Sequence, residues 1–398
     1  MSHAASPRRV LMTLATATGS GAGEAARHFC EALRRDGWCV DVVWGPPVRE
    51  QDGVSATAAM RAIGVDVHQL DRTIAPTLPV WTRLQPLAKA LRPTAVIGVM
   101  QRDRPVAMAL SRWLDVPGIV AAQNQHVFWG PRPVSVAKRL VYRFALQRWA
   151  SLVVCTSEPV RGEILAFGVP NERTVVLPNG IAPGERQALS PEDRHAARAE
   201  LGASPTDVLL INVGRLDVQK GQDILIEAFT TCARSRPHIR LALIGDVSGG
   251  PNQKRMAAFA ADLRRRVRAT GVAERIFFAG WRSDVARLLR AADGYVHAAR
   301  WEGFSFAMLE AFAAALPVVI TDCSGYPNGF VEAQHGWVVP REDSHALATA
   351  IGRLVDLTPE ASARMGLATR DLVEAHYDIR TVGAQFAGFV TQAVARGR

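Results

Sequence analysis

The segment DVLLINVGRLDVQKGQDILIEAF, residues 207–229, decides how the chain folds. It starts with a run of aliphatic residues, passes through a loop with two glycines, and continues with apolar residues at helical spacing. A strand that leads through a short loop into a helix is the repeating unit of a parallel sheet covered by helices. We therefore expect a strand over 207–216 and a helix that begins near Gly221.

Two cations lie on the loop of this segment. Arg215 ends the predicted strand, and Lys220 stands just ahead of the predicted helix. Parallel sheets of this type bind ligands at the carboxyl ends of their strands. The two side chains are therefore suited to hold a diphosphate, because both would meet it at that edge. The alternative is that both are solvated loop charges.

The same alternation of strand and helix runs through the rest of the chain. Strand-like runs precede the segment at 9–16, 39–44, 94–100, 118–124 and 151–157, and follow it at 239–246, 275–280, 294–299, 317–322 and 336–340. Between 178 and 206 the composition changes to proline, glycine and charge, which indicates a domain boundary. The sequence predicts an α/β protein of two doubly wound parallel-sheet (Rossmann-like) domains facing across a cleft. We assign the first domain to 1–185, the second to 186–375, and to 376–398 a C-terminal helix that could cross back to the first.

The composition agrees with a globular protein that needs no membrane span. The chain of 398 residues is 48% hydrophobic and 21% charged, and its five cysteines are scattered without the spacing of a metal site. It contains no run of about 18 apolar residues. The N-terminal MSHAASPRRVLMTLATATGSG resembles a signal peptide, but threonines interrupt its apolar part, so we interpret it as a first strand. We expect a cytoplasmic protein.

The positive charge is concentrated in the first half. Of the net charge of +10, residues 1–180 carry +8, with 21 Lys and Arg against 13 Asp and Glu. Such a surface suits an anionic membrane face or a phosphorylated substrate. No nucleic-acid-binding module accompanies the charge, so we expect no nucleic acid partner.

The loop TGSGAGEAA, residues 18–26, is the first strand-to-helix turn. Its glycines allow a bulky anion to approach the backbone at a helix N-terminus. A dinucleotide-binding fingerprint would need G-x-G-x-x-G and an acidic residue at the end of the second strand. The glycines are instead spaced G-x-G-x-G, and Asp41 lies early in that strand. An NAD site is therefore disfavoured.

The segment WEGFSFAMLEAF, residues 301–312, follows another predicted strand. Glu302 lies on the loop, Ser305 is placed to cap the helix, and Glu310 lies inside that helix. One interpretation is an exposed loop charge followed by an ordinary polar helix position. The other is that both carboxylates bind hydroxyls of one long ligand, with the helix N-terminus on a phosphate between them. The spacing fits a nucleotide-sugar.

Taken together, these motifs resemble a known family. VGRL and KG at 213–221, EGFSFAMLE at 302–310 and LPVVITD at 316–322, with LPNGI at the domain boundary, are similar to the retaining family 4 glycosyltransferases. The resemblance implies the glycosyltransferase-B fold, with an acceptor-binding first domain and a second domain that binds the nucleotide-sugar donor. It covers nearly the whole chain and is strongest over 207–340.

The resemblance also implies roles for single residues. Arg215 and Lys220 match the pair that neutralises the donor diphosphate. Glu302 matches the first glutamate of the E-x7-E motif, which addresses the transferred sugar, and Glu310 matches the second, which binds the ribose.

Other positions match the loops around the donor. Phe304, Ser305 and Phe306 match the loop whose backbone amides line the sugar and the phosphates. Gly19 and Gly21 match the N-terminal loop that faces the donor.

The histidine of AAQNQHVFWG, His126, matches one often found near sugar and acceptor. The alternative for a single loop histidine is a structural role.

The sequence departs from the family pattern at three places. Ser305 stands where a glycine is common, Asn328 where a glutamate is common, and the pair Arg300–Trp301 is unusual. These departures concern the donor sugar and the loop shape rather than the reaction. No D-x-D occurs, so we expect neither a metal nor another cofactor beyond the nucleotide-sugar co-substrate.

The resemblance implies retaining transfer of a hexose to a hydroxyl acceptor, by front-face attack in which the departing phosphate accepts the proton. The expected acceptor is a lipid-linked glycan or a precursor of lipopolysaccharide or exopolysaccharide. A nucleotide-sugar epimerase and a non-catalytic binding subunit are the alternatives on this fold. A phosphorylase is disfavoured because no pyridoxal-lysine signature is present.

The segment PVSVAKRLVYRFALQRW, residues 133–149, bears on where the protein works. It predicts an amphipathic helix with Leu140, Val141, Phe144 and Ala145 on one side and most of its cations elsewhere. One interpretation is a helix that rests on an anionic inner membrane surface. The other is a core helix with a solvated basic face.

Overall fold

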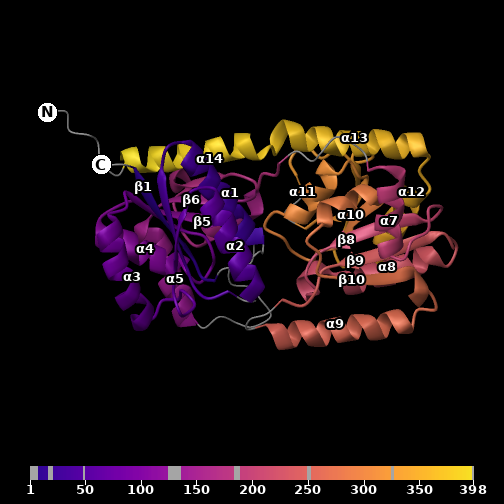
Figure 1. Ribbon diagram of the computed structural model, residues 1–398, viewed down its shortest axis with the longest axis horizontal. Helices are drawn as coiled ribbons and strands as arrows, with labels where there is room; N and C mark the ends of the chain where they lie inside the picture. The colour runs from indigo at the N-terminus through magenta and orange to yellow at the C-terminus, as the bar shows by residue number, and fades with distance from the viewer. Residues whose placement is uncertain are drawn as a thin grey trace. The chain divides into compact units, whose positions relative to one another are not determined.

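The computed structural model describes residues 8–16, 21–47, 50–123, 136–182, 189–248, 252–323 and 327–396. The chain divides into two compact units: unit 1 comprises residues 1–180 and 379–398, and unit 2 comprises residues 181–378. Each unit is built on one parallel sheet with helices packed around it (Figure 1). The predicted fold class, two doubly wound parallel-sheet domains, is confirmed.

Unit 1 contains a seven-stranded sheet in the order β3-β2-β1-β4-β5-β6-β7. Its strands are β1 (Arg9–Leu14), β2 (Cys39–Trp44), β3 (Asp66–Gln69), β4 (Ala95–Gly98), β5 (Gly118–Ala122), β6 (Ala150–Cys155) and β7 (Thr174–Val176). Its helices are α1 (Gly21–Arg35), α2 (Glu50–Ala62), α3 (Leu78–Leu91), α4 (Arg104–Leu114), α5 (Val136–Trp149), α6 (Glu158–Ala166) and α14 (Ile379–Arg396), with a 3-10 turn at η1 (Asn171–Arg173).

The core of unit 1 follows from the period-two alternation of its strands. One sheet face presents Leu11, Val96 and Val120 to a layer formed by α3, α4, α5 and α6. Helix α14, from the end of the chain, packs along α1, where the rings of Phe29 and Phe386 stack with their centroids 3.9 Å apart. The C-terminal helix is therefore part of the hydrophobic packing of unit 1.

Unit 2 contains a six-stranded parallel sheet in the order β10-β9-β8-β11-β12-β13. Its strands are β8 (Val208–Val213), β9 (Ile239–Ile244), β10 (Ile276–Gly280), β11 (Gly294–His297), β12 (Val318–Thr321) and β13 (Gly336–Val339). Its helices are α7 (Pro191–Glu200), α8 (Gln222–Ala233), α9 (Gln253–Arg268), α10 (Val285–Ala291), α11 (Phe306–Ala313), α12 (Ser344–Val355) and α13 (Pro359–His376), with 3-10 turns at η2 (Val218–Lys220) and η3 (Ala273–Arg275).

The central strands of unit 2 are buried on both faces, as expected for a parallel sheet. Leu210 and Val296 face the layer of α8, α9 and α12. Their chain neighbours Leu209 and Tyr295 face the layer of α7, α10, α11 and α13. The continuous aliphatic run that opens 207–229 thus reflects a central strand with no exposed side.

Helix α5 is present as predicted and packs on the core of unit 1, but three of the four residues of its predicted apolar side face solvent. Leu140, Val141 and Phe144 are 58%, 55% and 52% exposed. The helix packs on the core with Tyr142, Ala145 and Leu146, of which only Ala145 belongs to the predicted apolar side. Its apolar residues therefore point two ways, and one set faces solvent. None of the helices within the described ranges combines the length and the apolarity needed to cross a membrane.

Candidate functional site

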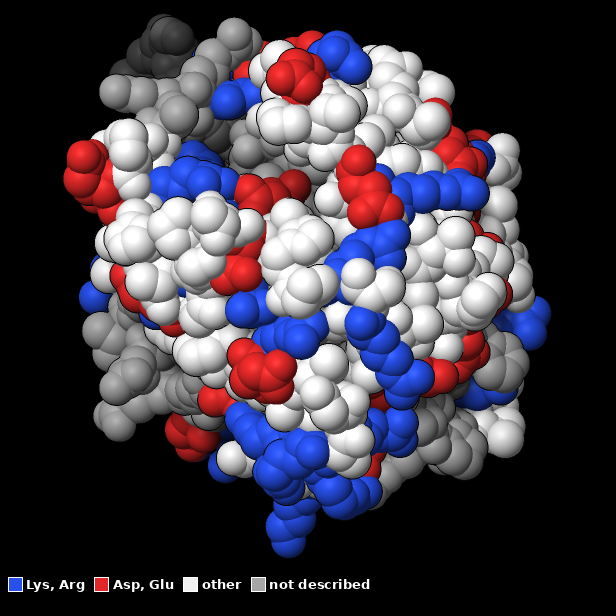
Figure 2. Space-filling model, turned by 90° about the vertical axis from the view of Figure 1, so that its right-hand side faces the viewer, with Lys and Arg blue, Asp and Glu red and all other residues white. Residues whose placement is uncertain are grey.

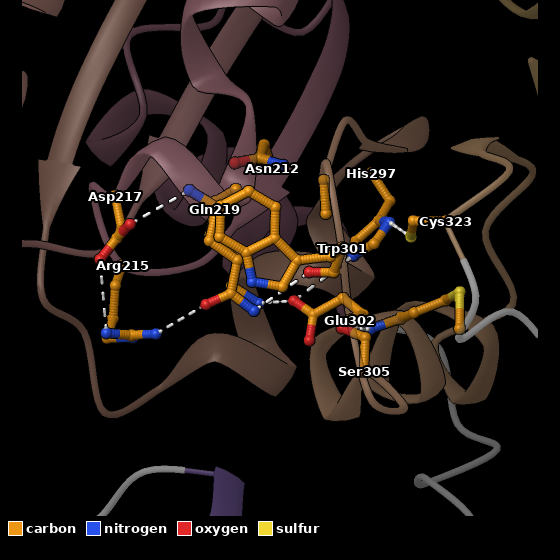
Figure 3. Close-up of polar contacts among 12 residues, drawn as sticks. Asn212, Arg215, Asp217, Gln219, His297, Trp301, Glu302, Ser305 and Cys323 are labelled. Atoms are coloured by element: carbon orange, nitrogen blue, oxygen red, sulfur yellow. Dashed lines mark hydrogen bonds and ion pairs between the residues drawn. The ribbon is translucent and has the colours of Figure 1, made fainter. Parts of the chain in front are cut away.

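The strand order of the second sheet reverses at β8, which lies between β9 and β11. The chain leaves the carboxyl ends of β8 and β11 as two loops, residues 214–221 and 298–305 (Figure 3). Asn212 links the two strands near these ends, because its side-chain amide donates a hydrogen bond to the carbonyl of Val296 over 2.8 Å. Doubly wound sheets bind ligands where the strand order reverses, so the two loops define the candidate site.

The first loop packs directly against the backbone of the second through a glycine. Gly221 has φ +64°, and a Cβ at this position would lie 1.9 Å from the carbonyl oxygen of Ala298. Only a residue without a side chain permits this approach. The strand and helix adjoining the loop are slightly shorter than predicted: Arg215 lies two residues beyond β8, and α8 begins at Gln222.

Lys220 and Glu302, 82 residues apart in sequence, meet where the loops touch. The Lys220 ammonium donates a hydrogen bond to Oε1 of Glu302, and the two side chains are only 15% and 10% exposed. Burial raises the pKa of Glu302, but the charge and hydrogen bond of Lys220, together with the other nearby groups, outweigh it, so this pKa lies below its usual value. The site thus places an amine and a carboxylate side by side in a largely buried position. An ammonium has three donors, so Lys220 can bind another anionic oxygen while it contacts Glu302.

His297 lies directly behind this pair and was not singled out from the sequence. It is the last residue of β11, it is 2% exposed, and its Nε2 lies 4.0 Å from Oε1 of Glu302 (Figure 3). Its Nδ1 lies 3.9 Å from Sγ of Cys323. Burial lowers the pKa of His297 to about 4. A neutral imidazole therefore faces the carboxylate. Its position at the carboxyl end of a central strand is the signal that could have identified it.

Arg215 lies at the solvent side of the first loop, with its side chain 43% exposed. Its guanidinium donates to Oε1 of Gln219 over 3.1 Å and lies 3.7 Å from Oδ2 of Asp217 (Figure 3). The Arg255 guanidinium, from α9, lies 3.5 Å from the same Asp217 oxygen. The structure therefore adds a second cation beside Arg215, which sequence spacing alone could not reveal.

The second loop leads into α11, as predicted. Ser305 is the N-cap, and its Oγ accepts a hydrogen bond from the amide of Met308 over 3.4 Å. The Phe304 side chain is buried and packs against Tyr377, so Phe304 can offer a ligand only its backbone. Phe306 is the first residue of the helix, and Glu310 lies in its second turn, half-buried. The N-terminus of α11 and both glutamates thus belong to one continuous segment.

The remaining predicted site residues belong to unit 1. Gly21 is the first residue of α1 and is exposed. Gly19 and His126 lie outside the described residues. Within the parts of the chain that the structure describes, no group of three or more His, Cys, Asp and Glu side chains is placed to hold a metal ion.

Comparison with known protein families covers both units. A model of the glycosyl transferases group 1 matches residues 193–371, and a model of the glycosyl transferase 4-like domain matches residues 20–180. The first match contains the whole candidate site of unit 2, from Arg215 to Glu310.

Two curated relatives share about a third of their matched residues with this chain. The lipopolysaccharide core biosynthesis mannosyltransferase LpsB of Rhizobium meliloti is 30% identical over 56% of this chain and 64% of its own length. The GDP-mannose-dependent alpha-(1-6)-phosphatidylinositol monomannoside mannosyltransferase of Mycolicibacterium smegmatis is 31% identical over 70% of this chain and 71% of its own length. The chain thus spans slightly less than two thirds of LpsB.

Solved structures match over almost the full length. The Anabaena protein HepE in complex with UDP and glucose has a TM-score of 0.80 at 20% identity, over 96% of this chain and 99% of that one. WaaG, a glycosyltransferase involved in lipopolysaccharide biosynthesis, has a TM-score of 0.70 at 20% identity, over 96% and 99%. These likenesses confirm the predicted fold of two Rossmann-like domains. The family models and the relatives show that the chain belongs to the family 4 glycosyltransferases.

Proposed function

We propose that the protein transfers a hexose from a nucleoside diphosphate sugar to a hydroxyl acceptor, with retention of configuration at the anomeric carbon. The observation that carries this proposal is the buried ion pair of Lys220 and Glu302 at the reversal point of the second sheet. A cation suits a diphosphate and a carboxylate suits sugar hydroxyls. A donor of this class needs both groups a short distance apart.

The diphosphate is the part of the donor on which negative charge develops during transfer. Lys220, with a buried side chain and free donor capacity, stabilises that charge, and Arg215 approaches from the solvent side. The N-terminus of α11 supplies backbone N–H groups and the positive end of the helix dipole.

The glutamates hold the two sugars of the donor. Glu302 orients the transferred hexose and stabilises positive character at its anomeric carbon, and Glu310 accepts hydroxyl hydrogens of the ribose. The acceptor oxygen attacks the anomeric carbon from the side that the diphosphate leaves. The bond to the diphosphate breaks as the new glycosidic bond forms, and the acceptor proton passes to the departing phosphate oxygen.

The roles of Gly19 and Gly21 toward the donor, and of His126 toward sugar and acceptor, rest on the family resemblance alone. So does the absence of a metal requirement. We propose that Lys220, Arg215 and the helix N-terminus replace a divalent cation at the diphosphate. We expect the transfer rate to be unchanged in excess EDTA. If EDTA stops transfer and added Mg²⁺ or Mn²⁺ restores it, the proposal that no metal is required is wrong.

The acceptor is proposed from the relatives. One is named for lipopolysaccharide core biosynthesis and the other for phosphatidylinositol monomannoside. We infer a lipid-linked glycan, a precursor of lipopolysaccharide or exopolysaccharide, as the acceptor class. Such an acceptor is presented at the cytoplasmic face of a membrane, so the enzyme must work beside lipid.

Unit 1 offers a surface suited to that position. Helix α5 exposes Leu140, Val141 and Phe144 and has no acidic residue among its fourteen, while Arg143 and Arg148 are exposed. Exposed apolar side chains interspersed with arginines match an anionic lipid surface. We propose that α5 rests on such a surface as a peripheral contact.

The charge of unit 2 is more mixed. On the face of unit 2 shown in Figure 2, blue and red side chains are interspersed among white ones. Cations gather at its lower edge, where Figure 1 places α9, whose last turn contains Arg265, Arg266 and Arg268. Two of these arginines already pair with Asp262. Because the cations of α9 are already partly paired, we assign the membrane contact to α5 and not to α9.

A panel of donors tests the proposed reaction. The wild-type protein is incubated with GDP-mannose, UDP-glucose, ADP-glucose and dTDP-glucose, and release of the nucleoside diphosphate is followed without acceptor. Slow release from one donor is expected. The anomeric proton of the product formed with an alcohol acceptor then reports the configuration by NMR, and inversion would contradict the retaining mechanism. No release and no thermal stabilisation by any nucleotide would favour a binding subunit.

A further inference from the structure

Arg300 is one of the residues that depart from the family pattern, and the structure shows where its side chain goes. It stands two residues before Glu302 and is 16% exposed. Nη1 donates to the carbonyl of Val218 over 2.7 Å, and Nη1 and Nη2 each donate to one oxygen of Asp223 over 2.9 Å. Nε donates to Glu342 over 3.0 Å. The side chain from one site loop is therefore bound to the other.

Backbone contacts tie the same two loops together. The amide of Arg300 donates to the carbonyl of Gln219 over 2.8 Å. In the opposite direction, Nε2 of Gln219 donates to the carbonyl of Trp301 over 3.1 Å (Figure 3). Gln219 and Trp301 are the chain neighbours of Lys220 and Glu302. Each half of the buried ion pair is thus held through the residue next to it.

The contacts of Arg300 flank Lys220 on both sides. Val218 and Gln219 precede it, and Asp223 follows it in the first turn of α8. A planar guanidinium can bind both oxygens of Asp223 and a carbonyl at once, which the single ammonium of a lysine cannot do in the same geometry. An arginine at this position therefore fixes the loop of Lys220 relative to its own.

We propose that Arg300 is a positioning residue, which sets the distance between the Lys220 ammonium and the Glu302 carboxylate that the donor requires. This inference rests on the proposed function. Arg300 acts through its neighbours: its donors are engaged by Val218, Asp223 and Glu342. A displacement of about 1 Å in such a site lowers a rate by about a hundredfold, so modest loosening of the two loops is enough to matter.

Arg300→Lys tests the proposal, because it keeps the positive charge and removes the planar guanidinium that binds both oxygens of Asp223. The matched control is Arg236→Lys. Arg236 also binds both oxygens of a carboxylate of unit 2, that of Asp356, at the ends of α8 and α12. It contacts neither site loop in the described structure. The measured quantity is kcat/KM for nucleoside diphosphate release from the donor panel, in the wild type, in both variants, and with each variant combined with Lys220→Ala.

The expected result is a fall of about tenfold to a hundredfold for Arg300→Lys and less than twofold for Arg236→Lys. In the Lys220→Ala background, Arg300→Lys should lower the remaining rate by less than about threefold, because the group that it positions is gone. Equal rates for the two arginine variants, or effects that multiply fully with Lys220→Ala, would overturn the inference while the proposed function stands. A wild-type protein that releases no nucleotide from any donor would overturn both.

Discussion

The ammonium of Lys220 and the carboxylate of Glu302 form a buried ion pair across 82 residues of sequence, at the ends of two neighbouring strands. Glu302 is buried, and the side chain of Lys220 is 15% exposed. Removing one partner of such a pair leaves the other charge buried without compensation, whereas removing both leaves two neutral groups of similar shape.

Because the two side chains form an ion pair, the effect of a substitution on stability can be distinguished from its effect on activity. We expect Lys220→Met and Glu302→Gln each to lower the free energy of unfolding by about 3 kcal/mol. The double variant should regain most of this loss and remain inactive. Urea unfolding of the three variants measures the first effect and nucleotide release the second. Additive losses in the double variant would show that the two side chains do not interact.

The buried imidazole of His297 predicts a pH dependence of stability. The unfolded chain binds a proton there near pH 6.5, and the folded chain only near pH 4. Stability from the neutral imidazole is therefore fully present above pH 6.5 and is lost as the pH falls toward 4, by about 3 kcal/mol in all. His297→Gln should flatten the slope of unfolding free energy between pH 7 and pH 5.

The control for this slope is His345→Gln, since His345 is exposed on α12. It should keep the wild-type pH dependence. If His297→Gln and His345→Gln have the same slope as the wild type, His297 is not the group that titrates.

Gly221 and Gly271 allow the cost of backbone strain to be distinguished from the cost of a steric clash. Both have a left-handed backbone, but only Gly221 is crowded. Gly221 and Gly271 have φ +64° and +74°, but an added Cβ meets the Ala298 carbonyl at the first and nothing within 4 Å at the second. Gly271→Ala should cost about 1 kcal/mol, from the left-handed conformation alone. Gly221→Ala should cost about 3 kcal/mol or more and should slow nucleotide release, because the loop of Lys220 must move. Equal losses would mean that the loops tolerate separation.

The exposed face of α5 predicts binding to anionic vesicles. Phe144→Ser or Leu140→Ser should weaken cosedimentation with phosphatidylglycerol-containing vesicles about tenfold each, and should leave the unfolding midpoint unchanged. Leu367→Ser is the matched control, because Leu367 is 56% exposed on α13 of unit 2. Binding by the wild type should weaken with salt. Equal sedimentation of the wild type with and without vesicles would remove the membrane contact from the account.

Much of the fold could be predicted from the sequence because the central strands of a parallel sheet must be apolar on both faces. Strands such as β8 and β11 are buried on both faces, so their aliphatic runs are continuous and easy to recognise. The two strands missing from the prediction, β3 and β7, are the edge strands of their sheet. β3 reads DVHQ and is partly exposed, and β7 has three residues. Edge strands need little apolar burial, so the sequence has little signal there.

The candidate site was predictable where a residue type is tied to a loop position. Lys220, Glu302 and the N-cap Ser305 stand at strand ends or a helix start, and the structure places them there. His297 was missed although it ends a central strand. Arg300 was not predicted as a site residue, because its role depends on contacts with residues distant in sequence. Tyr142, whose hydroxyl accepts a hydrogen bond from buried Arg104, shows the same for α5. This contact lies on the face of α5 that packs on the core, and the periodicity of the sequence does not reveal it.

The most direct test of the account compares nucleotide release by the wild type, Lys220→Met, Glu302→Gln and the control Arg236→Lys on the same donor panel. We expect release from one sugar nucleotide by the wild type and the control, and a loss of at least about a hundredfold in both site variants. Release at the wild-type rate by either site variant would contradict the claim that this ion pair is the centre of the transfer reaction.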